Sequence, residues 1–380
     1  MRETVYVLGG GQTRFGELWE ASLADLIREA VDRAIENTEI LPTDIDAVVI
    51  GNMLGGETAG QAHLGTLVSG CLPHHPPALR VEAACASGGL AVHTACALLE
   101  SDKAETILVV GAEKLTDVPG ETVTSALMHA ADAEKDSPSG LTFPGIFALT
   151  ATAYMHAYGI SRENLSLVSA CSHRAAVSNP FAQFRRELPP EAVSKSPLVA
   201  DPLRLLDCSP ISDGAAAIIL STKRESPVRI AASQLASERL SLSDRPSLTS
   251  FGSTRSAFDR ALAEASWQRN DIDCIELHDC FSTATLIHLE DLGYCEEGEA
   301  IRLYCQKDTD SNGSLPVNPS GGLKACGHPI GATGVKQILD CYKQLTGQAP
   351  NQVRNAIRAL AHNVGGVGAT CVVHLLESIA

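Results

Sequence analysis

The sequence predicts an α/β fold with mixed or parallel sheets, built from two related halves. Short apolar runs alternate with stretches of helical periodicity, and one helix–turn–strand pattern occurs twice. Strands that alternate with helices are typical of α/β domains. A chain of 380 residues has room for two or three domain-sized units, and it can bury a core without disulfides or metal ions.

Four apolar runs are the predicted strands of the first half. They cover residues 5–8, 47–50, 106–110 and 215–220. Their near-continuous apolarity indicates burial on both faces of a sheet. Residues 22–37 place apolar side chains at helical spacing, and Ser22 is a suitable N-cap for that helix.

The second half repeats two patterns of the first. Residues 26–37 lead into Asp44-Ile-Asp-Ala-Val-Val-Ile-Gly, and residues 258–266 lead into Asp271-Ile-Asp-Cys-Ile-Glu-Leu-His. Likewise, Cys85-Ala-Ser-Gly-Gly-Leu and Cys326-Gly-His-Pro-Ile-Gly are small-residue turns that each open a helix. Those helices, at 90–99 and 333–345, precede strands at 106–110 and 356–360. Two echoes in the same order favour a duplicated domain.

A region of different composition separates the halves. The expected division is an N-terminal half of residues 1–116 and 201–222, an inserted loop domain of residues 117–200, and a C-terminal half of residues 223–380. The insertion is rich in Ser, Pro, His and Ala, with helical patches at 150–158 and 165–176. It is either a lid over an active site or an ordinary solvated helical region. Residues 221–229 form the expected linker between the repeats.

Charge excludes some classes of partner. Lys and Arg number 29 against 45 Asp and Glu, which gives a formal net charge of −16. Such an acidic chain has no electrostatic footprint for nucleic acid or for an anionic membrane surface. An anionic substrate must therefore meet a local basic patch or backbone amides. The insertion holds a local surplus of basic residues: Arg174, Arg185, Arg186 and Lys195.

The cysteine pattern and the termini predict a cytoplasmic protein. Twelve cysteines are scattered without a paired framework, which indicates reduced thiols. The N-terminal residues become glycine-rich too early for a signal peptide, and the C-terminus is no peroxisomal address. No run of 18 apolar residues is present, so no membrane span is expected.

Cys85 is the strongest candidate nucleophile. It stands just before two glycines and a predicted helix start, where the helix dipole is expected to favour the thiolate. Glycines allow an acyl group to approach the sulfur, and the same turn supplies backbone N–H groups for an oxyanion. The alternative is a packed cysteine in a tight turn.

Three further candidates lie in the second half. His278 and Cys280 follow a buried strand, and side chains two residues apart face the same side of an extended chain. Open α/β sheets build sites at this end of their strands. His328 lies in a glycine-rich loop suited to close approach. Taken singly, each histidine is also compatible with a structural role.

A zinc site and a dinucleotide-binding loop are two alternatives to nucleophilic chemistry. His278, Cys280, Cys326 and His328 form a Cys2His2 set with ligands suited to zinc. One residue separates the members of each pair, whereas structural zinc sites usually place two to four there, so no metal is expected. The Gly9-Gly10-Gly11 turn resembles a dinucleotide loop but lacks the GxGxxG spacing.

Four loops together resemble the active-site loops of thiolases. They begin at Cys85-Ala-Ser-Gly-Gly, His278-Asp-Cys-Phe, Gly327-His-Pro-Ile-Gly-Ala-Thr-Gly and Asn363-Val-Gly-Gly-Val-Gly, in the order of the family. Asp201-Pro-Leu-Arg-Leu-Leu-Asp and Ser212-Asp-Gly-Ala-Ala-Ala extend the resemblance over nearly the whole chain. The archaeal and sterol-carrier-protein-type branch is the most similar. The resemblance implies a five-layer αβαβα fold of two related halves with a lid-like loop domain.

The resemblance also implies roles. His328 takes the proton of Cys85, which attacks an acyl-CoA; Cys280 then deprotonates acetyl-CoA, whose enolate oxygen is held by His278 and His328. The backbone N–H groups of Cys85 and Gly365 form a second oxyanion hole. In the larger thiolase branch an Asn replaces His278, and the second catalytic cysteine occupies the loop of Asn363. Here Cys280 takes that role, and the role of the Asn363 side chain is open.

Coenzyme A thioesters are the implied substrates, and no permanently bound cofactor is implied. Arg174, Arg185, Arg186 and Lys195 are candidates for the coenzyme A phosphates. Two alternatives are a decarboxylating ketoacyl synthase and a structural subunit of an acyl-CoA-metabolising complex. The resemblance also implies a homodimer or tetramer, and a complex with hydroxymethylglutaryl-CoA synthase and a small OB-fold protein.

Overall fold

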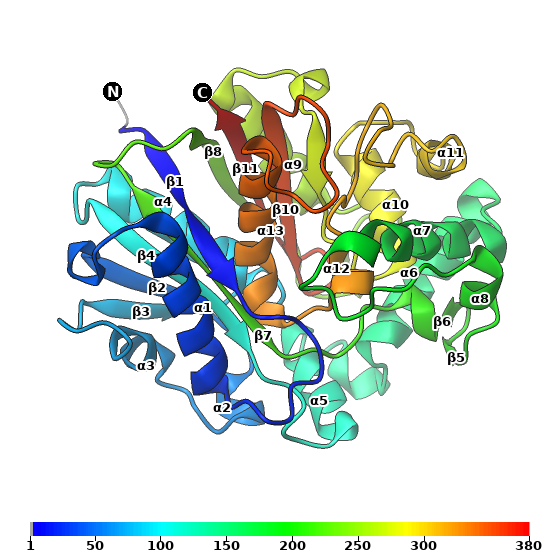
Figure 1. Cartoon of the computed structure of the whole chain (residues 1–380). Coiled ribbons are helices and arrows are strands. Elements are labelled where there is room, and N and C mark those ends of the chain that lie inside the picture. The colour runs from blue at the N-terminus through cyan, green and yellow to red at the C-terminus, as the bar shows by residue number, and fades with distance from the viewer. Residues whose placement is uncertain (1–2, 380) are drawn as a thin grey trace.

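A mixed sheet of nine strands forms the framework of the computed structural model, which describes residues 3–379 (Figure 1). Its strand order is β3-β2-β4-β7-β1-β8-β11-β10-β9. The bounds are β1 Val5–Gln12, β2 Ala47–Gly51, β3 Ala78–Val81, β4 Thr106–Glu113, β7 Gly214–Ser221, β8 Val228–Ser237, β9 Cys274–Glu276, β10 Arg358–Gly365 and β11 Thr370–Ser378. A separate ribbon pairs β5 (Leu198–Ala200) with β6 (Leu203–Arg204).

Helices cover the outer faces of the two halves of this sheet, and other helices lie between the two halves. Their bounds are α1 Leu23–Thr38, α2 Gly55–Thr58, α3 Leu64–Ser69, α4 Ser87–Glu100, α5 Gly120–Leu127, α6 Phe143–Tyr158, α7 Arg162–Ala175, α8 Pro190–Ser194, α9 Gly252–Ala265, α10 Ser282–Asp291, α11 Ala300–Cys305, α12 Gly322–Cys326 and α13 Ile330–Leu345. Ser22 caps α1 as expected, in a capping box with Asp25.

The molecule has five layers, because alternate residues of the strands enter different cores. In β7, Ile218 and Leu220 enter a central core that contains α4 and α13, whereas Ile219 enters an outer core with α1. In β11, Leu376 enters the same central core, whereas Leu375 enters an outer core with α9. The order is therefore α1, half of the sheet, α4 with α13, the other half of the sheet, and α9. The expected αβαβα architecture is confirmed.

Strand directions repeat between the halves. β1 and β4 both run antiparallel to β7, and β2 is parallel to β4. β8 and β10 both run antiparallel to β11, and β9 is parallel to β10. The duplication read from the sequence is present. The two halves of the sheet join edge to edge, because Val5 and Tyr6 of β1 pair with Ile230 and Arg229 of β8.

The second aspartate of the repeated Asp-Ile-Asp turn makes equivalent hydrogen bonds in both halves. The Asp46 carboxylate accepts hydrogen bonds from the backbone N–H groups of Glu105 and Thr106, both at 2.9 Å. The Asp273 carboxylate accepts from Ile357 and Arg358, both at 2.8 Å. In each case the aspartate precedes one strand and ties down the start of its neighbour. The repeat is thus maintained by equivalent contacts.

The two central helices touch through glycines. A Cβ atom added to Gly88 of α4 would lie 2.6 Å from the Gly331 carbonyl oxygen of α13. One added to Gly334 would lie 2.0 Å from the Gly89 nitrogen. Any side chain at these positions would push the backbones apart. Because Cys85 precedes α4 and His328 precedes α13, this contact brings two candidate residues to one place.

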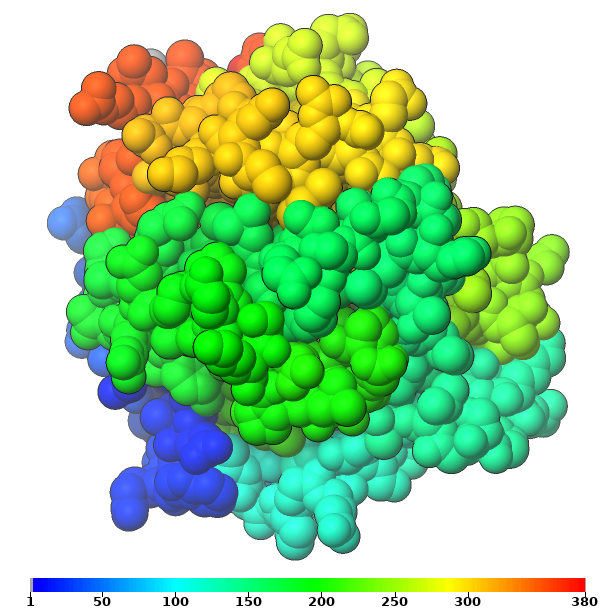
Figure 2. Space-filling model, turned by 90° about the vertical axis from the view of Figure 1, so that its right-hand side faces the viewer, coloured from blue at the N-terminus to red at the C-terminus, as the bar shows by residue number. Residues whose placement is uncertain are grey.

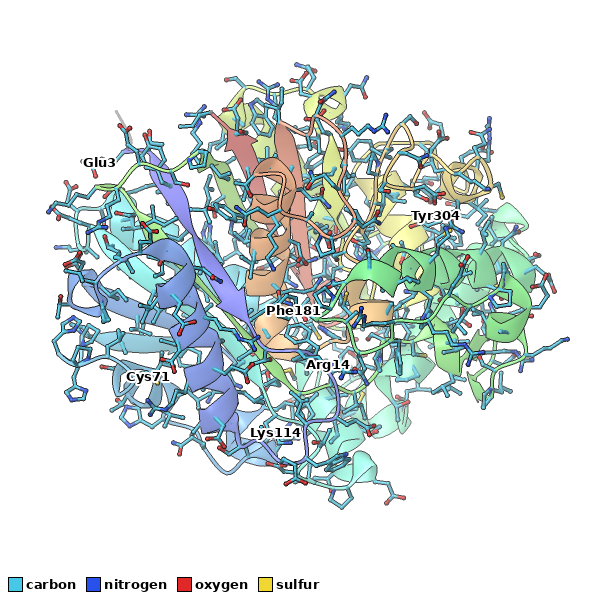
Figure 3. All side chains as sticks on the ribbon, in the orientation of Figure 1. Glu3, Arg14, Cys71, Lys114, Phe181 and Tyr304 are labelled. Carbon is cyan, nitrogen blue, oxygen red and sulfur yellow. The ribbon has the colours of Figure 1, made fainter. Side chains whose placement is uncertain are left out.

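The region between β4 and β7 packs on the C-terminal half. Residues of α6 and α7 share a hydrophobic core with α10 and α11, and Tyr154 hydrogen-bonds to Glu290. Figure 2 shows this green region across the middle of one face of the molecule. Its far end also meets the N-terminal half, where the Phe15 N–H donates to the Phe181 carbonyl at 3.0 Å; Arg14 and Phe181 lie close together in Figure 3.

The expected linker at 221–229 is shorter in the structure. β7 includes Ser221 and β8 begins at Val228, so residues 222–227 connect the two strands. All twelve cysteines are free thiols. Within residues 3–379, the helices are too short or too polar to cross a bilayer.

Candidate active site

The candidate residues meet where the strands of the central layers end and the central helices begin. The Cys85 sulfur and one ring nitrogen from each of His278 and His328 all lie within 4.8 Å of one another. The two imidazole rings are nearly perpendicular, with centroids 5.1 Å apart. Three loops far apart in the sequence therefore supply one reaction centre.

Cys85 lies in a strained turn before α4. Ala84 has a φ of 49°, a left-handed conformation that is uncommon for a residue with a side chain. The Ser87 hydroxyl closes this turn: it donates to the Ala84 carbonyl at 2.6 Å and accepts from the Ala83 N–H at 2.9 Å. Gly365 packs against the turn, since a Cβ atom there would lie 2.2 Å from the Ala83 carbonyl oxygen.

The resting state of Cys85 differs from the expectation. The loss of solvent around its thiol raises the pKa of Cys85 to about 12, and the negative charge of Glu113 acts in the same direction. A hydrogen bond from the Gly366 backbone N–H lowers this pKa, but it does not offset the desolvation. The prediction that the helix start favours the thiolate is therefore wrong. At neutral pH Cys85 is a thiol that needs a base.

His328 is prepared to be that base. Its Nδ1 lies 2.7 Å from the Thr333 hydroxyl oxygen, and that hydroxyl donates its own hydrogen to the Pro329 carbonyl at 3.0 Å. The Thr333 oxygen can then only accept, so the neutral ring carries its proton on Nδ1. Nε2 keeps its lone pair, and it is buried without a hydrogen-bond partner. Burial lowers the pKa of His328 to about 3, so the ring is neutral at pH 7.

The His328 loop is held from two sides. A Cβ atom on Gly327, whose φ is 101°, would lie 2.6 Å from the Ser212 hydroxyl oxygen. That hydroxyl accepts the His328 N–H at 3.0 Å and donates to the Gln183 side chain at 2.6 Å. The next residue, Asp213, forms a buried ion pair with Lys114 at 2.8 Å; Lys114 is labelled in Figure 3. The Ser-Asp-Gly motif therefore positions the base.

His278 follows β9 and is fully enclosed. Burial lowers its pKa well below the usual range for histidine, and a positive charge on His328 would lower it further. Its Nδ1 lies 3.1 Å from the side-chain nitrogen of Asn363. Its backbone N–H donates to Nδ1 of His362 at 3.4 Å. Both contacts come from the end of β10.

Cys280 is buried beside the same centre. Desolvation raises the pKa of its thiol, and a charge on Cys85 raises it further, while the ammonium group of Lys324 lowers it. Lys324 is itself buried, and its Nζ donates to the Asp279 carbonyl at 2.5 Å. A buried cation therefore holds the peptide bond that precedes Cys280.

The structure does not assemble the Cys2His2 zinc set. The Cys326 thiol donates to the Ser320 carbonyl at 3.0 Å, and its sulfur lies 3.4 Å from the Asn179 side-chain nitrogen. It belongs to a small core with Ala176 and Ala182. Among residues 3–379, the grouped His, Cys and acidic ligands are Cys85, His278 and His328 alone.

The four basic candidates of the insertion are placed differently. Arg174 pairs with Asp310 at 2.5 Å and lines a cavity of about 280 Å³ together with Tyr304, which is labelled in Figure 3. Arg185, Arg186 and Lys195 are exposed. Of these four candidates, Arg174 is thus in an ion pair within residues 3–379, whereas the other three are exposed to solvent.

Sequence reasoning missed three supporting side chains: Thr333, Lys324 and Asn363. Thr333 stands one helical turn into α13, and Lys324 is a lone charge in a glycine-rich apolar loop. A charge in such a loop was a usable signal. The Thr333 contact was not, because threonine is common in the first turn of a helix.

Comparison with known proteins assigns the chain to a family. The family model described as "Thiolase, N-terminal domain" matches residues 5–224. The model described as "Thiolase C-terminal domain-like" matches residues 235–378. The chain belongs to the thiolase family. As a thiolase it is an acyltransferase, and the family match does not favour the decarboxylating or purely structural alternatives.

Individual relatives place this thiolase in the expected branch. It is 44% identical to an acetyl-CoA acetyltransferase of Methanothermobacter thermautotrophicus, over 98% of this chain and 99% of the relative. It is 32% identical to human sterol carrier protein 2, over 97% of this chain and 71% of that protein. The solved structure of the "Ltp2-ChsH2(DUF35) aldolase" has the same fold, with a TM-score of 0.84, 23% identity and coverage of 99% and 98% of the two chains.

Proposed function

We propose that this thiolase is an acetyl-CoA C-acyltransferase. It catalyses the reversible Claisen condensation of acetyl-CoA with an acyl-CoA, or the thiolysis of a 3-oxoacyl-CoA such as acetoacetyl-CoA, through an acyl-cysteine. The observation that carries the proposal is the unpartnered Nε2 of His328 in the group that contains the Cys85 thiol. The name of the archaeal relative, acetyl-CoA acetyltransferase, supports acetyl-CoA as a substrate.

In the first half-reaction, His328 Nε2 takes the proton of Cys85. The thiolate attacks the thioester carbonyl, and the oxyanion accepts hydrogen bonds from the backbone N–H groups of Cys85 and Gly365. Coenzyme A leaves with the proton from His328. The acyl group is now bonded to Cys85, and His328 is neutral again.

In the second half-reaction, Cys280 is the base. Transfer of its proton to His328 Nε2 gives a thiolate beside the Lys324 ammonium group, and a second N–H donor beside His278. The thiolate removes a proton from the acetyl-CoA methyl group, and the enolate oxygen accepts from His278 and His328. The enolate carbon attacks the acyl group, and Cys85 leaves and takes the proton of His328.

Coenzyme A-dependent loss of acetoacetyl-CoA, with production of acetyl-CoA, tests this function. Cys85→Ser is expected to abolish the covalent acetyl adduct; a normal adduct on that variant would remove Cys85 from its role. Cys280→Ala is expected to keep the adduct and lose condensation by roughly 100-fold or more. Unchanged condensation in Cys280→Ala, with release of carbon dioxide from malonyl-CoA, would instead favour a decarboxylating synthase.

Coenzyme A is expected to bind on the inserted region. Arg185, Arg186 and Lys195 are exposed and suited to its phosphates, whereas Arg174 is already paired with Asp310. Charge reversal at Arg185 and Arg186 should weaken coenzyme A binding. Equal weakening by reversal at Arg174 would show that its ion pair opens for the ligand.

We also propose a cytoplasmic homodimer or tetramer. β3 is one of the two edge strands of the sheet, and an edge strand offers unpaired backbone groups to a second copy. The Ltp2 aldolase is named together with ChsH2(DUF35), which supports a small partner protein here. We further propose that this partner has an OB fold and that the complex includes hydroxymethylglutaryl-CoA synthase. Light scattering of the purified chain tests the oligomer, and a monomer at micromolar concentration would contradict it.

A further inference from the structure

Asn363 contacts three groups at the reaction centre with one small side chain. It is buried near the end of β10. Its Oδ1 accepts the backbone N–H of Gly89 at 3.0 Å. Its Nδ2 lies 3.1 Å from the Cys85 carbonyl oxygen and 3.1 Å from Nδ1 of His278. The amide therefore links the nucleophile turn, the first turn of α4 and the His278 loop.

The backbone partners fix the orientation of this amide. The Gly89 N–H can only donate, so it must face the amide oxygen. The Cys85 carbonyl can only accept, so it must face the amide nitrogen. These two contacts place Oδ1 and Nδ2 without reference to the histidine.

The second hydrogen on Nδ2 then determines where His278 carries its proton. An amide nitrogen can only donate, so Nδ1 of His278 must be the unprotonated nitrogen. In the neutral ring the proton therefore lies on Nε2. His328 has the opposite arrangement, because Thr333 keeps its proton on Nδ1 and leaves Nε2 as a base.

We propose that Asn363 is the positioning residue that makes His278 a hydrogen-bond donor to the enolate oxygen, by assigning the His278 proton to Nε2. This inference rests on the proposed condensation. A thiol at this position could not make these contacts, since it lacks two donors and an acceptor in one plane.

His362 holds the backbone of His278 beside the contact that Asn363 makes with the ring. It accepts the His278 backbone N–H at Nδ1, so its own proton lies on Nε2, which is 3.2 Å from the Thr254 hydroxyl. That hydroxyl then donates to Nδ1 of His288 at 3.2 Å. The backbone and the ring of His278 are thus held by neighbouring residues of one strand.

The test is Asn363→Asp, which keeps the shape but removes both donors. A carboxylate would accept from His278 and move its proton to Nδ1, leaving Nε2 without hydrogen. We expect deuterium exchange into the acetyl-CoA methyl group to fall roughly 100-fold or more, as on loss of an oxyanion-hole donor. Formation of the acetyl adduct on Cys85 should fall by less than about tenfold, because backbone groups serve that step. Equal losses in both steps would contradict the proposal.

Asn179→Asp is the matched control. Its buried amide also donates to a backbone carbonyl, that of Ser320 at 2.9 Å, but it does not touch the histidines. Both half-reactions of this variant should stay near those of the wild type. A thermal melt of each variant shows whether it is folded.

Nitrogen-15 NMR of labelled histidines reads the proton directly, and His278→Gln identifies the resonance. The wild-type His278 should be protonated on Nε2, and on Nδ1 in Asn363→Asp. A wild-type signal protonated on Nδ1 overturns the inference even if Asn363→Asp does not fold. Protonation on Nε2 without any thiolase turnover would instead leave this assignment standing and reject the proposed function.

Discussion

Nδ1 of His328 lies 2.7 Å from the Thr333 hydroxyl oxygen, five residues further along the chain. This contact keeps Nε2 of His328 free for the Cys85 proton, and it stabilises the imidazolium that forms. Thr333→Val keeps the shape and removes the acceptor. We expect acetyl-adduct formation to slow by roughly 10- to 100-fold, since a hydrogen bond to a charged group contributes about 1.5–3 kcal/mol.

Thr333→Ser is the control for that variant, because it restores the hydroxyl. Rapid quenching and mass spectrometry measure the adduct. If valine and serine at this position react at equal rates, the hydroxyl does not direct the proton.

Lys324 is predicted to act on the second half-reaction only. Lys324→Gln keeps a donor for the Asp279 carbonyl but removes the charge that lowers the pKa of Cys280. The pH dependence of methyl-deuterium exchange should therefore shift to higher pH, with little change in acetyl-adduct formation. An unchanged exchange profile would limit Lys324 to a structural role.

The protonated resting state of Cys85 predicts its alkylation profile. Because desolvation raises the pKa of Cys85 to about 12, the rate of modification by iodoacetamide should keep rising with pH through pH 10. Peptide mapping separates Cys85 from the other thiols. A plateau near neutral pH would indicate a thiolate–imidazolium pair instead.

Buried neutral histidines predict loss of stability in acid. Burial lowers the pKa of His374 to about 3 from 6.5, so the unfolded chain binds a proton that the folded chain does not. The neutral buried ring of His374 therefore makes its full contribution to the free energy of unfolding above pH 6.5, and this contribution is lost as the pH falls toward 3. It amounts to about 2 kcal/mol between pH 7 and pH 5.

His374→Gln should reduce the loss of unfolding free energy on that acidification by this amount. The amide can keep a donor to the Gly89 carbonyl, which lies 3.1 Å from His374 Nε2. Buried carboxyl groups such as Glu113, whose pKa is raised by burial, change the free energy of unfolding in the opposite direction on acidification. The wild type and His374→Gln share these groups, so the comparison between the two proteins is not affected. Urea midpoints at pH 7 and pH 5 provide the measurement, and an identical pH dependence would show that His374 is not neutral when folded.

Much of the fold was predictable because local patterns agree with it. The apolar runs at 106–110 and 215–220 lie inside β4 and β7, and the repeated turns lie before β2 and β9. The strand expected at 356–360 was too short. β10 continues to Gly365, because each residue of Asn363–Gly365 pairs with β11. Pairing with the next strand of the hairpin overrides the weak strand propensity of glycine.

The reacting groups of the site were predictable from the sequence, whereas their protonation states were not. Cys85, His278 and His328 lie in recognisable loops, and the structure brings them together. The direction of the Cys85 pKa depends on how much solvent its neighbours exclude, which no local pattern reveals. The role of Asn363 depends on contacts with residues 274 and 278 positions away.

The glycine contact between α4 and α13 has a consequence for substrate range. The sulfur nucleophile and its base are each attached to the start of a helix, and these helices meet backbone to backbone at Gly88, Gly331 and Gly334. Their separation is set by main-chain packing, and from the region between β4 and β7 the side chains of Ser212 and Gln183 hold the His328 loop. Changes elsewhere in that region can therefore alter which acyl chains are accepted while proton transfer between Cys85 and His328 stays the same.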